Sequence, residues 1–586
     1  MACFSAPPND SLLLAGPETP TNEAADVLMA GCSPWVKNPC MRDEARTQKE
    51  GLGPEAKAVV VGGGLGGLAL AIRLQAAGLS TTILEKRPQL GGRAYQLRDR
   101  GYVFDMGPSL IAAPGILQSL FRAAGREMSD YLSMIRLEPY YRLHFHDGTH
   151  LDYVGEAKHM KAQMRAFNAQ DADRFDSFMK AVRPIYDAVI AGRLGSASFD
   201  KVGKMTRVLP RLIRMRAFRH VTDVVEHYFE DFRHRIFFSF HPLFIGGNPF
   251  LTPAIYLVIP ALEREGDVWF PLGGVYTVVE SLSALFRELG GEIRTSQEVT
   301  RIVVEDGRAT GVEIETDTLA ADVVVSNADV GHTYGDLVAR EARHHWTDRR
   351  LKHLHYSMSC FVLYLGVGRR YTQLRHHTLI VSEHYERQLE SIFEAGVLPE
   401  DLSLWVHAPT VSDPSMAPEG CECLHVIVPV PNKASGLVWE EEAPRLADRV
   451  LDALEAWGME GLRDNIEVMH LFTPDDFESE LNAPYGNAFS VDPRLTQTGW
   501  FRPHGRSEDV ENLYLVGAGT HPGAGVPGVL LSAEATFDSI ASDVGLPAAP
   551  DHHLPGVAEM DVNPGHEKRE SADLRTPPRQ VQAFPD

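Results

Sequence analysis

A glycine-rich segment close to the start of the chain constrains its fold more than any other short stretch. Residues 59–68, VVVGGGLGGL, join an apolar run to a run with helical character. In such a segment Gly62 allows a tight turn, Gly64 lets the backbone approach a pyrophosphate, and Gly67 brings helix and strand together. A helix that opens near Leu65 points its unpaired N–H groups at the phosphates. The segment predicts the first strand, turn and helix of a Rossmann-like domain.

An acidic residue follows at the spacing that this kind of site requires. Glu85 lies 18 residues after Gly67, at the end of a second apolar stretch, residues 81–84. A carboxylate at that place can bind a ribose hydroxyl. Together with the glycines, Glu85 predicts a binding site for an adenine dinucleotide.

The residues after Glu85 favour one dinucleotide over another. Leu90 is followed by the turn Gly91-Gly92-Arg93 and then by GYVFDMGP, residues 101–108. The turn offers a second close approach of backbone to ligand, and the arginine offers a guanidinium fork for the pyrophosphate. Flavoproteins of the amine-oxidase and carotenoid-desaturase type carry this combination, so the resemblance favours FAD over NAD.

A second glycine-rich segment lies far along the chain, at residues 512–528. Residues 513–516 have the pattern of a short buried strand, and residues 529–540 look helical after a break at Pro527-Gly528. Five glycines fall within residues 517–528, which indicates close approach to a ligand. If this strand joins the first sheet, the helix N-terminus faces the flavin ring. Its dipole would stabilise negative charge there by roughly 0.3–1 kcal/mol, up to about 2 when partly buried.

The chain resembles the bacterial-type phytoene desaturases, members of the FAD-dependent carotenoid desaturase family, from about residue 57 to about residue 545. Motifs spread along the whole core carry the resemblance: residues 62–74, 91–108, 239–250 (SFHPLFIGGNPF), 269–274 (WFPLGG), 326–334 (SNADVGHTY), 404–420, 500–504 (WFRPH) and 512–529.

This resemblance implies a fold, a cofactor and a reaction. The fold is α/β, with a Rossmann-like FAD-binding domain, a mixed-sheet substrate domain and a helical, membrane-facing region, as in amine oxidases. The implied reaction converts 15-cis-phytoene to all-trans-lycopene through phytofluene, ζ-carotene and neurosporene. A hydride leaves to flavin N5, a proton leaves the neighbouring carbon, and quinone or oxygen reoxidises the flavin. In related flavoproteins a backbone contact at the position of Val299 holds the adenine. The expected FAD-binding residues are Gly62, Gly64, Leu65, Gly67, Glu85, Lys86, Gly92, Arg93, Gly107, Pro108, Val299, Gly517, Gly519, Val526 and Gly528.

The domains are expected to be assembled from separated stretches. Strand patterns at residues 291–295, 299–304 and 311–315, with a hairpin turn at Asp306-Gly307, return the chain to the cofactor domain. The predicted order is a disordered N-terminal extension (1–55), a first FAD-binding part (56–112), a helical membrane-facing and substrate region (113–290), a second FAD-binding part (291–335), the substrate domain (336–508), a last FAD-binding part (509–545) and a disordered tail (546–586).

Composition narrows the function classes further. The chain has 586 residues, 44% of them hydrophobic, which suffices for two or three domains. Its six cysteines match neither a disulfide framework nor a C-x-x-C zinc site, so a reducing compartment is expected. A net charge of −23 argues against nucleic acid as a partner. With eight acids against four bases, residues 1–55 resemble neither a secretory signal nor a transit peptide.

One basic segment interrupts the acidic chain. Residues 201–219 contain seven Lys and Arg residues and no acid, and apolar residues alternate with them at helical spacing. Pro210 is expected to divide the segment into two short helices. A basic amphipathic stretch favours docking on an anionic membrane surface, here the cytoplasmic side of a membrane as a peripheral protein. The alternative is a solvated helix that packs on the protein's own core. The oligomeric state is left open.

No catalytic base is evident from the sequence. His521 lies in the glycine-rich loop expected near the flavin ring, where an imidazole could take a proton near neutral pH, and His241 is a second candidate. The alternative for His521 is a structural cap or a hydrogen-bond partner of the cofactor. The 24 histidines show no H-E-x-x-H or comparable spacing, so no metal is predicted.

Two further alternatives stay open at this point. The same scaffold serves carotenoid isomerases, ketolases and desaturases of other substrates or step numbers, which only a product profile separates. A carotenoid-binding protein without turnover is another, although such a protein would not need both glycine-rich segments.

Overall fold

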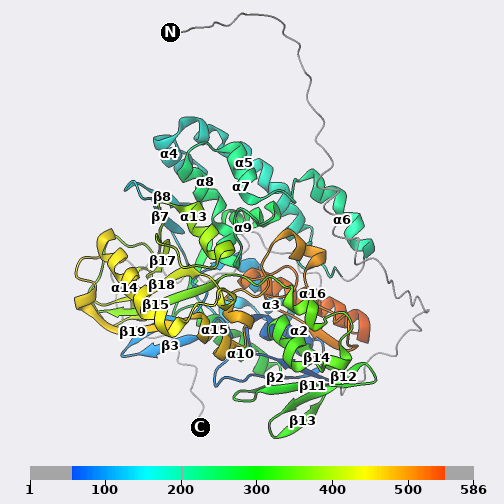
Figure 1. Ribbon diagram of the computed structural model, residues 1–586. Helices are drawn as coiled ribbons and strands as arrows, with labels where there is room; N and C mark the ends of the chain where they lie inside the picture. Colours follow the sequence, from blue (N-terminus) through cyan, green and yellow to red (C-terminus); the bar gives the residue numbers. More distant parts are fainter. Residues whose placement is uncertain (1–55, 200–201, 548–586) are drawn as a thin grey trace, which may run out of the picture. The chain divides into compact units, whose positions relative to one another are not determined.

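The computed structural model describes residues 56–199 and 202–547 (Figure 1). The N-terminal extension predicted to be disordered, and nearly all of the predicted C-terminal tail, lie outside these residues.

A five-stranded parallel sheet forms the cofactor-binding part, in the strand order β10-β2-β1-β14-β20. Its strands come from the three separated stretches that the sequence predicts: β1 (Lys57–Val61), β2 (Ser80–Leu84), β10 (Glu292–Arg294), β14 (Val323–Ser326) and β20 (Leu513–Leu515). Because all strands run in one direction, their carboxyl ends meet at one edge. Both predicted glycine-rich segments therefore reach the same edge, as the Rossmann-like fold requires.

Helix α2 (Leu65–Ala76) follows β1 directly and is apolar on nearly every side. It is buried because α10 (Tyr276–Glu288) and α16 (Val526–Val544) both pack against it. Helix α2 and the second glycine-rich segment approach each other closely because both have glycine at the contact. A Cβ on Gly66 would lie 3.0 Å from the Cα of Gly517. Helix α16 begins at Val526, earlier than the sequence pattern indicates, because Pro527 occupies its first turn, where no backbone N–H is needed.

A three-stranded antiparallel sheet stands beside the parallel one. It contains β11 (Val299–Glu305), β12 (Arg308–Ile314) and β13 (Asp317–Ala320). Asp306 and Gly307 connect the first two strands with φ values of 50° and 78°. This left-handed pair is the conformation of a type I′ turn, so the predicted hairpin is confirmed.

A seven-stranded sheet, in the order β19-β15-β18-β17-β16-β7-β8, forms the centre of the substrate part. Its strands are β7 (Tyr141–His144), β8 (His150–Tyr153), β15 (Ser359–Val367), β16 (His377–Ile380), β17 (Leu404–His407), β18 (Glu422–Val430) and β19 (Ile466–Phe472). One face packs against α14 (Trp439–Trp457), with Phe361, Val406, Val426 and Leu446 in a common core (Figure 1). The side chains of alternate residues point to the opposite face.

The prediction of residues 113–290 as a helical region was incomplete. Strands β7 and β8 come from it, and β7 pairs with β16 from a distant part of the sequence. A parallel pairing over such a separation leaves no local pattern to read. The rest of the region is mainly helical: α3 (Pro114–Ala123), α4 (Ala157–Phe167), α5 (Ala169–Tyr186), α6 (Val202–Arg214), α7 (Val221–Tyr228), α8 (Phe232–Ser239) and α9 (Val258–Gly266).

The expected division of the basic segment at Pro210 was wrong. Helix α6 runs without a break from Val202 to Arg214, with Pro210 inside it and exposed. A proline removes one backbone hydrogen bond, and on an exposed face the carbonyl that loses its partner can turn to water. Among the described residues, no helix combines the length and the apolar character that a membrane span needs.

Candidate active site

A cavity of about 540 Å³ lies between the carboxyl edge of the parallel sheet and the seven-stranded sheet. Both glycine-rich segments line it at one end. Apolar side chains from the seven-stranded sheet and from the helical region line the rest. The cavity thus joins a polar glycine cradle to a hydrocarbon-like chamber.

Most of the predicted FAD-binding residues meet at the glycine-lined end. Those that line the cavity are Gly62, Gly64, Leu65, Glu85, Lys86, Gly92, Arg93, Gly107, Pro108, Val299, Gly517, Val526 and Gly528. The other two pack the cradle from behind. A Cβ on Gly67 would lie 2.3 Å from the Gly62 carbonyl oxygen, and a Cβ on Gly519 would lie 2.6 Å from Val330 Cγ2. The predicted role of Gly67 in helix–strand packing is confirmed by this contact.

Backbone N–H groups of the first glycine-rich loop and of Arg87 hold the Glu85 carboxylate in place. Its Oε2 accepts a hydrogen bond of 2.8 Å from the Gly63 N–H, and its Oε1 accepts one of 3.0 Å from the Arg87 N–H. These bonds fix the carboxylate at the end of β2 and beside the turn, where a ribose would lie.

Asn327 links the two glycine-rich segments. It lies in the SNADVGHTY motif that carries the resemblance, but it is not among the predicted FAD-binding residues. A Cβ on Gly64 would lie 2.9 Å from Asn327 Nδ2, and one on Gly517 would lie 2.7 Å from Asn327 Oδ1. Only glycine fits on either side of this amide. Asn327 and its neighbours Ala328 and Asp329 also line the cavity.

These residues fit FAD on structural grounds. Arg93 presents a buried Nε that has no hydrogen-bond partner among the described residues, while its Nη2 contacts Asn487 at 3.2 Å. A buried guanidinium donor without a partner is unfavourable unless a ligand supplies the acceptor. The pyrophosphate would lie between Arg93 and the N-terminus of α2, and the N-terminus of α16 would face the ring.

His521 lies at the edge of this arrangement and points away from it. Its Nε2 donates a hydrogen bond of 2.9 Å to the Leu194 carbonyl, and its ring meets Phe199 edge-on at 4.7 Å. It is not among the residues that line the cavity, although Pro522 is. Burial lowers the pKa of His521 to about 4. A catalytic role for His521 stays a prediction.

The floor of the apolar chamber is one continuous row across the seven-stranded sheet. Register pairing places Leu379 opposite Trp405, Trp405 opposite Ile427, and Ile427 opposite Val362. On the other side Leu379 pairs with Leu143. All five side chains line the cavity. The row offers a surface without hydrogen-bonding groups, apart from the indole N–H of Trp405.

A polar row lies two residues along the same strands, on the same face. His377, His407, His425, Tyr364 and His470 are successive partners across β16, β17, β18, β15 and β19. Burial lowers the pKa of His377 to about 4 and that of His425 to about 3, so these rings are neutral near pH 7. The row reaches the surface at His470, whose Nε2 lies 2.9 Å from Asp99 Oδ2.

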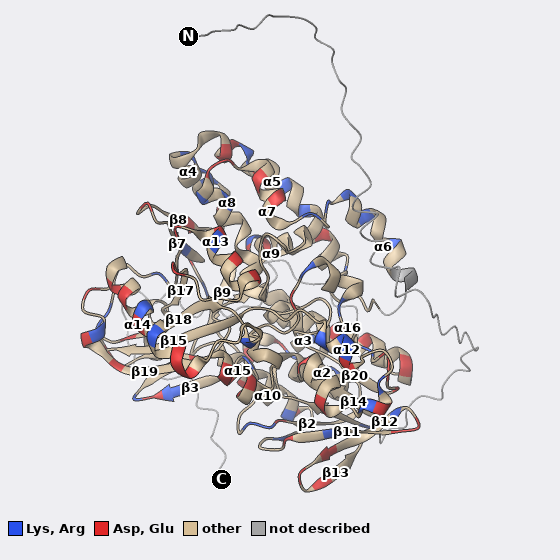
Figure 2. Ribbon diagram, in the orientation of Figure 1, with Lys and Arg blue, Asp and Glu red and all other residues tan. Residues whose placement is uncertain are grey.

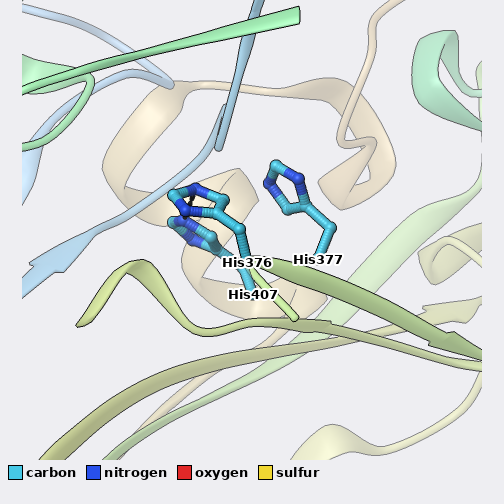
Figure 3. A group of neighbouring side chains, drawn as sticks. All are labelled: His376, His377 and His407. Atoms are coloured by element: carbon cyan, nitrogen blue, oxygen red, sulfur yellow. Dashed lines mark hydrogen bonds between the residues drawn. The ribbon is translucent and has the colours of Figure 1, made fainter. Parts of the chain in front are cut away.

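Three buried histidines cluster at the other end of this row (Figure 3). The donor nitrogens of His376, His377 and His407 lie within 4.8 Å of one another. His376 and His407 share a hydrogen bond of 3.1 Å between their Nε2 atoms. His377 instead contacts the Tyr140 carbonyl at 3.1 Å and Ser109 Oγ at 3.1 Å. These are donor atoms that a metal could use, and no sequence spacing revealed them because His407 arrives from another strand. The absence of a metal stays a prediction.

Comparison with known proteins places this site in a family. The sequence model of flavin-containing amine oxidoreductases matches residues 65–538. A lycopene-forming phytoene desaturase from Pseudescherichia vulneris is 44% identical over 490 residues, 83% of this chain and 99% of the relative. The lycopene-forming phytoene desaturase of Pantoea ananas is 42% identical over 83% of this chain and 99% of the relative. A neurosporene-forming phytoene desaturase from Rhodobacter capsulatus is 38% identical over 87% of this chain and 97% of the relative.

Solved structures agree on the fold. An oxidoreductase from Methanosarcina mazei superimposes with a TM-score of 0.57 at 19% identity, covering 82% of this chain and 99% of the other. A putrescine oxidase superimposes with a TM-score of 0.56 at 15% identity, covering 83% of this chain and 99% of the other. These structures confirm the predicted amine-oxidase-like architecture, and the match to the flavin-containing family confirms the FAD cofactor. The chain belongs to the flavin-containing amine oxidoreductase family and, within it, to the phytoene desaturases.

Proposed function

We propose that this protein desaturates 15-cis-phytoene in successive steps to all-trans-lycopene, through phytofluene, ζ-carotene and neurosporene. The observation that carries the proposal is that one continuous cavity joins the glycine cradle to an apolar floor. A hydrocarbon has no polar group by which it could be recognised, so the shape of the chamber must set the position of the reacting carbon atoms.

Bound FAD supplies the hydride acceptor. The chain's own residues then have three tasks: to hold the cofactor, to align the hydrocarbon beside it, and to keep water out. The row Leu143, Leu379, Trp405, Ile427 and Val362 performs the second and third tasks. Quinone or oxygen is the proposed acceptor that returns the flavin to its oxidised form.

We place the protein on the cytoplasmic side of a membrane as a peripheral protein. Moving a hydrocarbon from the bilayer into water costs about 0.8 kcal/mol of free energy for each CH₂ group. For a forty-carbon chain, transfer through water would therefore cost tens of kcal/mol. Helix α6 supports direct uptake from the bilayer: Figure 2 shows Lys and Arg residues along it, and the apolar Ile213 is 58% exposed between Arg211 and Arg214.

Liposome flotation tests this docking role. A variant with Arg207, Arg211 and Arg214 changed to Ser should lose flotation with anionic vesicles, whereas a variant with Arg301 and Arg308 changed to Ser, on the antiparallel sheet, should keep it. Equal flotation of the first variant and the unchanged protein would exclude α6 as the docking element.

Relatives of this chain form several different end products, so the identity of the product needs the most testing. Neurosporene-forming and ζ-carotene-forming phytoene desaturases are also relatives, at 38% and 36% identity, and a 4,4'-diapolycopene oxygenase is 31% identical. Isomerase and ketolase activities share the scaffold as well. A non-catalytic carotenoid-binding protein would show no flavin spectrum after supplementation with FAD.

Pigment chromatography of a phytoene-accumulating host that expresses the chain distinguishes these possibilities. Lycopene as the main product supports the proposal. Neurosporene or ζ-carotene as the end product would mean that the protein carries out fewer desaturation steps than proposed. Unchanged phytoene, with the protein folded and loaded with flavin, would contradict the proposed substrate.

A further inference from the structure

One carboxylate stands in the apolar part of the cavity wall. Glu263 lies on α9, is 1% exposed, and is among the residues that line the cavity. The lining residues around it in sequence, Ile259 and Leu262, are apolar. Moving an unpaired carboxylate into such a place costs several kcal/mol, so its hydrogen-bond partners decide what it can do.

Two partners hold Glu263 from behind. The Tyr141 hydroxyl donates a hydrogen bond of 2.8 Å to Glu263 Oε2 and lies 2.8 Å from His241 Nε2. His241 Nε2 also lies 3.3 Å from Glu263 Oε2. Since the hydroxyl proton goes to the carboxylate, His241 donates from Nε2 to the Tyr141 oxygen. This tautomer leaves His241 Nδ1 without a proton, which suits a buried atom that has no partner among the described residues.

The other ionisable groups nearby do not compete for this role. Burial raises the pKa of Tyr141 and of Tyr153 well above the usual value, so both stay protonated. Tyr153, from β8, donates instead to the Pro260 carbonyl at 3.2 Å. Arg264, the next residue on α9, turns to the ring of Phe175 at 5.6 Å. Of the three hydrogen-bonded residues, only Glu263 lines the cavity, so it is the one that a bound hydrocarbon can reach.

Stability alone does not explain this arrangement. Apolar residues could fill the same volume beside Tyr141, against which Phe240 and Phe244 pack, without burying a carboxylate, and such replacements are often neutral or stabilising. A carboxylate at the wall of a chamber for hydrocarbon has one evident use there, because desaturation releases a proton as well as a hydride.

We infer that Glu263 is the proton acceptor of the desaturation, with Tyr141 and His241 as positioning residues. In this step a C–H bond breaks on the carbon next to the one that gives up its hydride. The electron pair of that bond forms the new C=C bond, and the proton goes to Glu263. The hydride and its two electrons reduce FAD, the oxidant. The inference rests on the proposed function.

The test compares Glu263→Gln with Glu265→Gln, two residues along the same helix. Glu265 is 35% exposed and pairs with Arg183 at 2.8 Å, so its substitution leaves the cavity unchanged. FAD-loaded proteins are mixed anaerobically with phytoene in vesicles, and flavin reduction is followed against pH. E263Q should react at least about 100-fold more slowly, the usual contribution of a general base. The unchanged protein and E265Q should share a loss of rate on the acid side that E263Q lacks.

Infrared difference spectroscopy provides a readout that does not depend on turnover. Acidification of the FAD-loaded protein without substrate should produce the carbonyl band of a buried protonated carboxyl group, and E263Q should lack it. Tyr141→Phe is the second variant, for the case that E263Q does not fold. It keeps the carboxylate but removes its hydrogen-bond donor, so it should shift both the pH at which the rate falls and the frequency of the infrared carbonyl band.

The outcomes separate the two levels of the proposal. If the unchanged protein fails to reduce its flavin with phytoene, the proposed function fails. If it succeeds and E263Q matches its rate and pH profile, the role of Glu263 is overturned. An unchanged pH profile in Tyr141→Phe would overturn the positioning role.

Discussion

Trp405 on β17 and Ile427 on β18 lie directly opposite each other in an antiparallel pair, and both line the cavity. Their neighbours on either side in the same row are also apolar. The opposite face of these strands packs against α14. One sheet therefore serves as the core of the substrate part and as the floor of the chamber.

A charge placed on this floor should weaken substrate binding. Ile427→Glu is expected to lower kcat/KM for phytoene at least about tenfold, since burying a carboxylate against hydrocarbon costs more than about 2 kcal/mol. FAD content should stay unchanged because Ile427 lies outside the glycine cradle. Met469→Glu, at a position on β19 that is 47% exposed, is the matched control. Equal loss in both variants would contradict the floor assignment.

The cradle should not tolerate a methyl group at Gly67. A Cβ there would lie 2.3 Å from the Gly62 carbonyl oxygen, so α2 and the turn must move apart. Gly67→Ala is expected to lower the free energy of unfolding by about 1–3 kcal/mol and to release FAD. Flavin absorbance per protein and the melting temperature measure both effects. Gly335→Ala is the control, since its Cβ would meet no atom within 4 Å. Full FAD content in Gly67→Ala would disprove this packing role.

The buried histidine row makes stability depend on pH. The pKa of His425 is about 3 in the folded protein against 6.5 as its ordinary value. Below about pH 6.5 the unfolded chain therefore takes up a proton that the folded protein does not. The free energy of unfolding should fall with pH towards pH 3, by about 1.4 kcal/mol per unit for each such histidine.

Denaturant titrations at several pH values measure this slope. His425→Gln should make the slope shallower over that window, whereas His159→Gln, at an exposed position, should leave it as it is. An identical slope in His425→Gln would mean that His425 does not remain neutral.

The variant His521→Ala distinguishes Glu263 from His521 as the proton acceptor, because the two assignments predict opposite effects on flavin reduction. If Glu263 takes the proton, His521→Ala loses the hydrogen bond to Leu194 and the edge-on contact with Phe199, which together are about 1–3 kcal/mol of stability, and keeps substrate-dependent flavin reduction. If His521 is the base, as the sequence suggested, that reduction should fall at least about 100-fold in a protein that still binds FAD. Anaerobic single-turnover measurement separates the two.

The cofactor-binding end of the cavity could be predicted from the sequence because the residues that form it lie close together within short segments of the chain. Gly62, Gly64 and Gly67 lie in one short segment, from the turn after β1 into α2, and Glu85 directly follows the next strand, so short-range geometry defines their positions. The second segment at residues 517–528 was recognisable by its glycine content, and its strand does join the same sheet.

The substrate end depends on pairing between distant strands, which local spacing does not encode. His377, His407 and His425 meet only because three strands align in one register. Glu263 lies in the sequence ALEREG, where alternating acids and bases are typical of an exposed helix face. Its burial follows from the packing of α9 against α5 and against the segment that carries His241, with the Tyr141 hydroxyl of β7 bonded to the carboxylate.

Anaerobic mixing of the FAD-loaded protein with phytoene-containing vesicles tests the central claim most directly. Flavin absorbance and pigment chromatography are followed in the same sample. The account predicts loss of the oxidised flavin band together with one new double bond per flavin reduced, and lycopene after repeated reoxidation. Oxidised flavin and unchanged phytoene, with a folded and fully loaded protein, would contradict it.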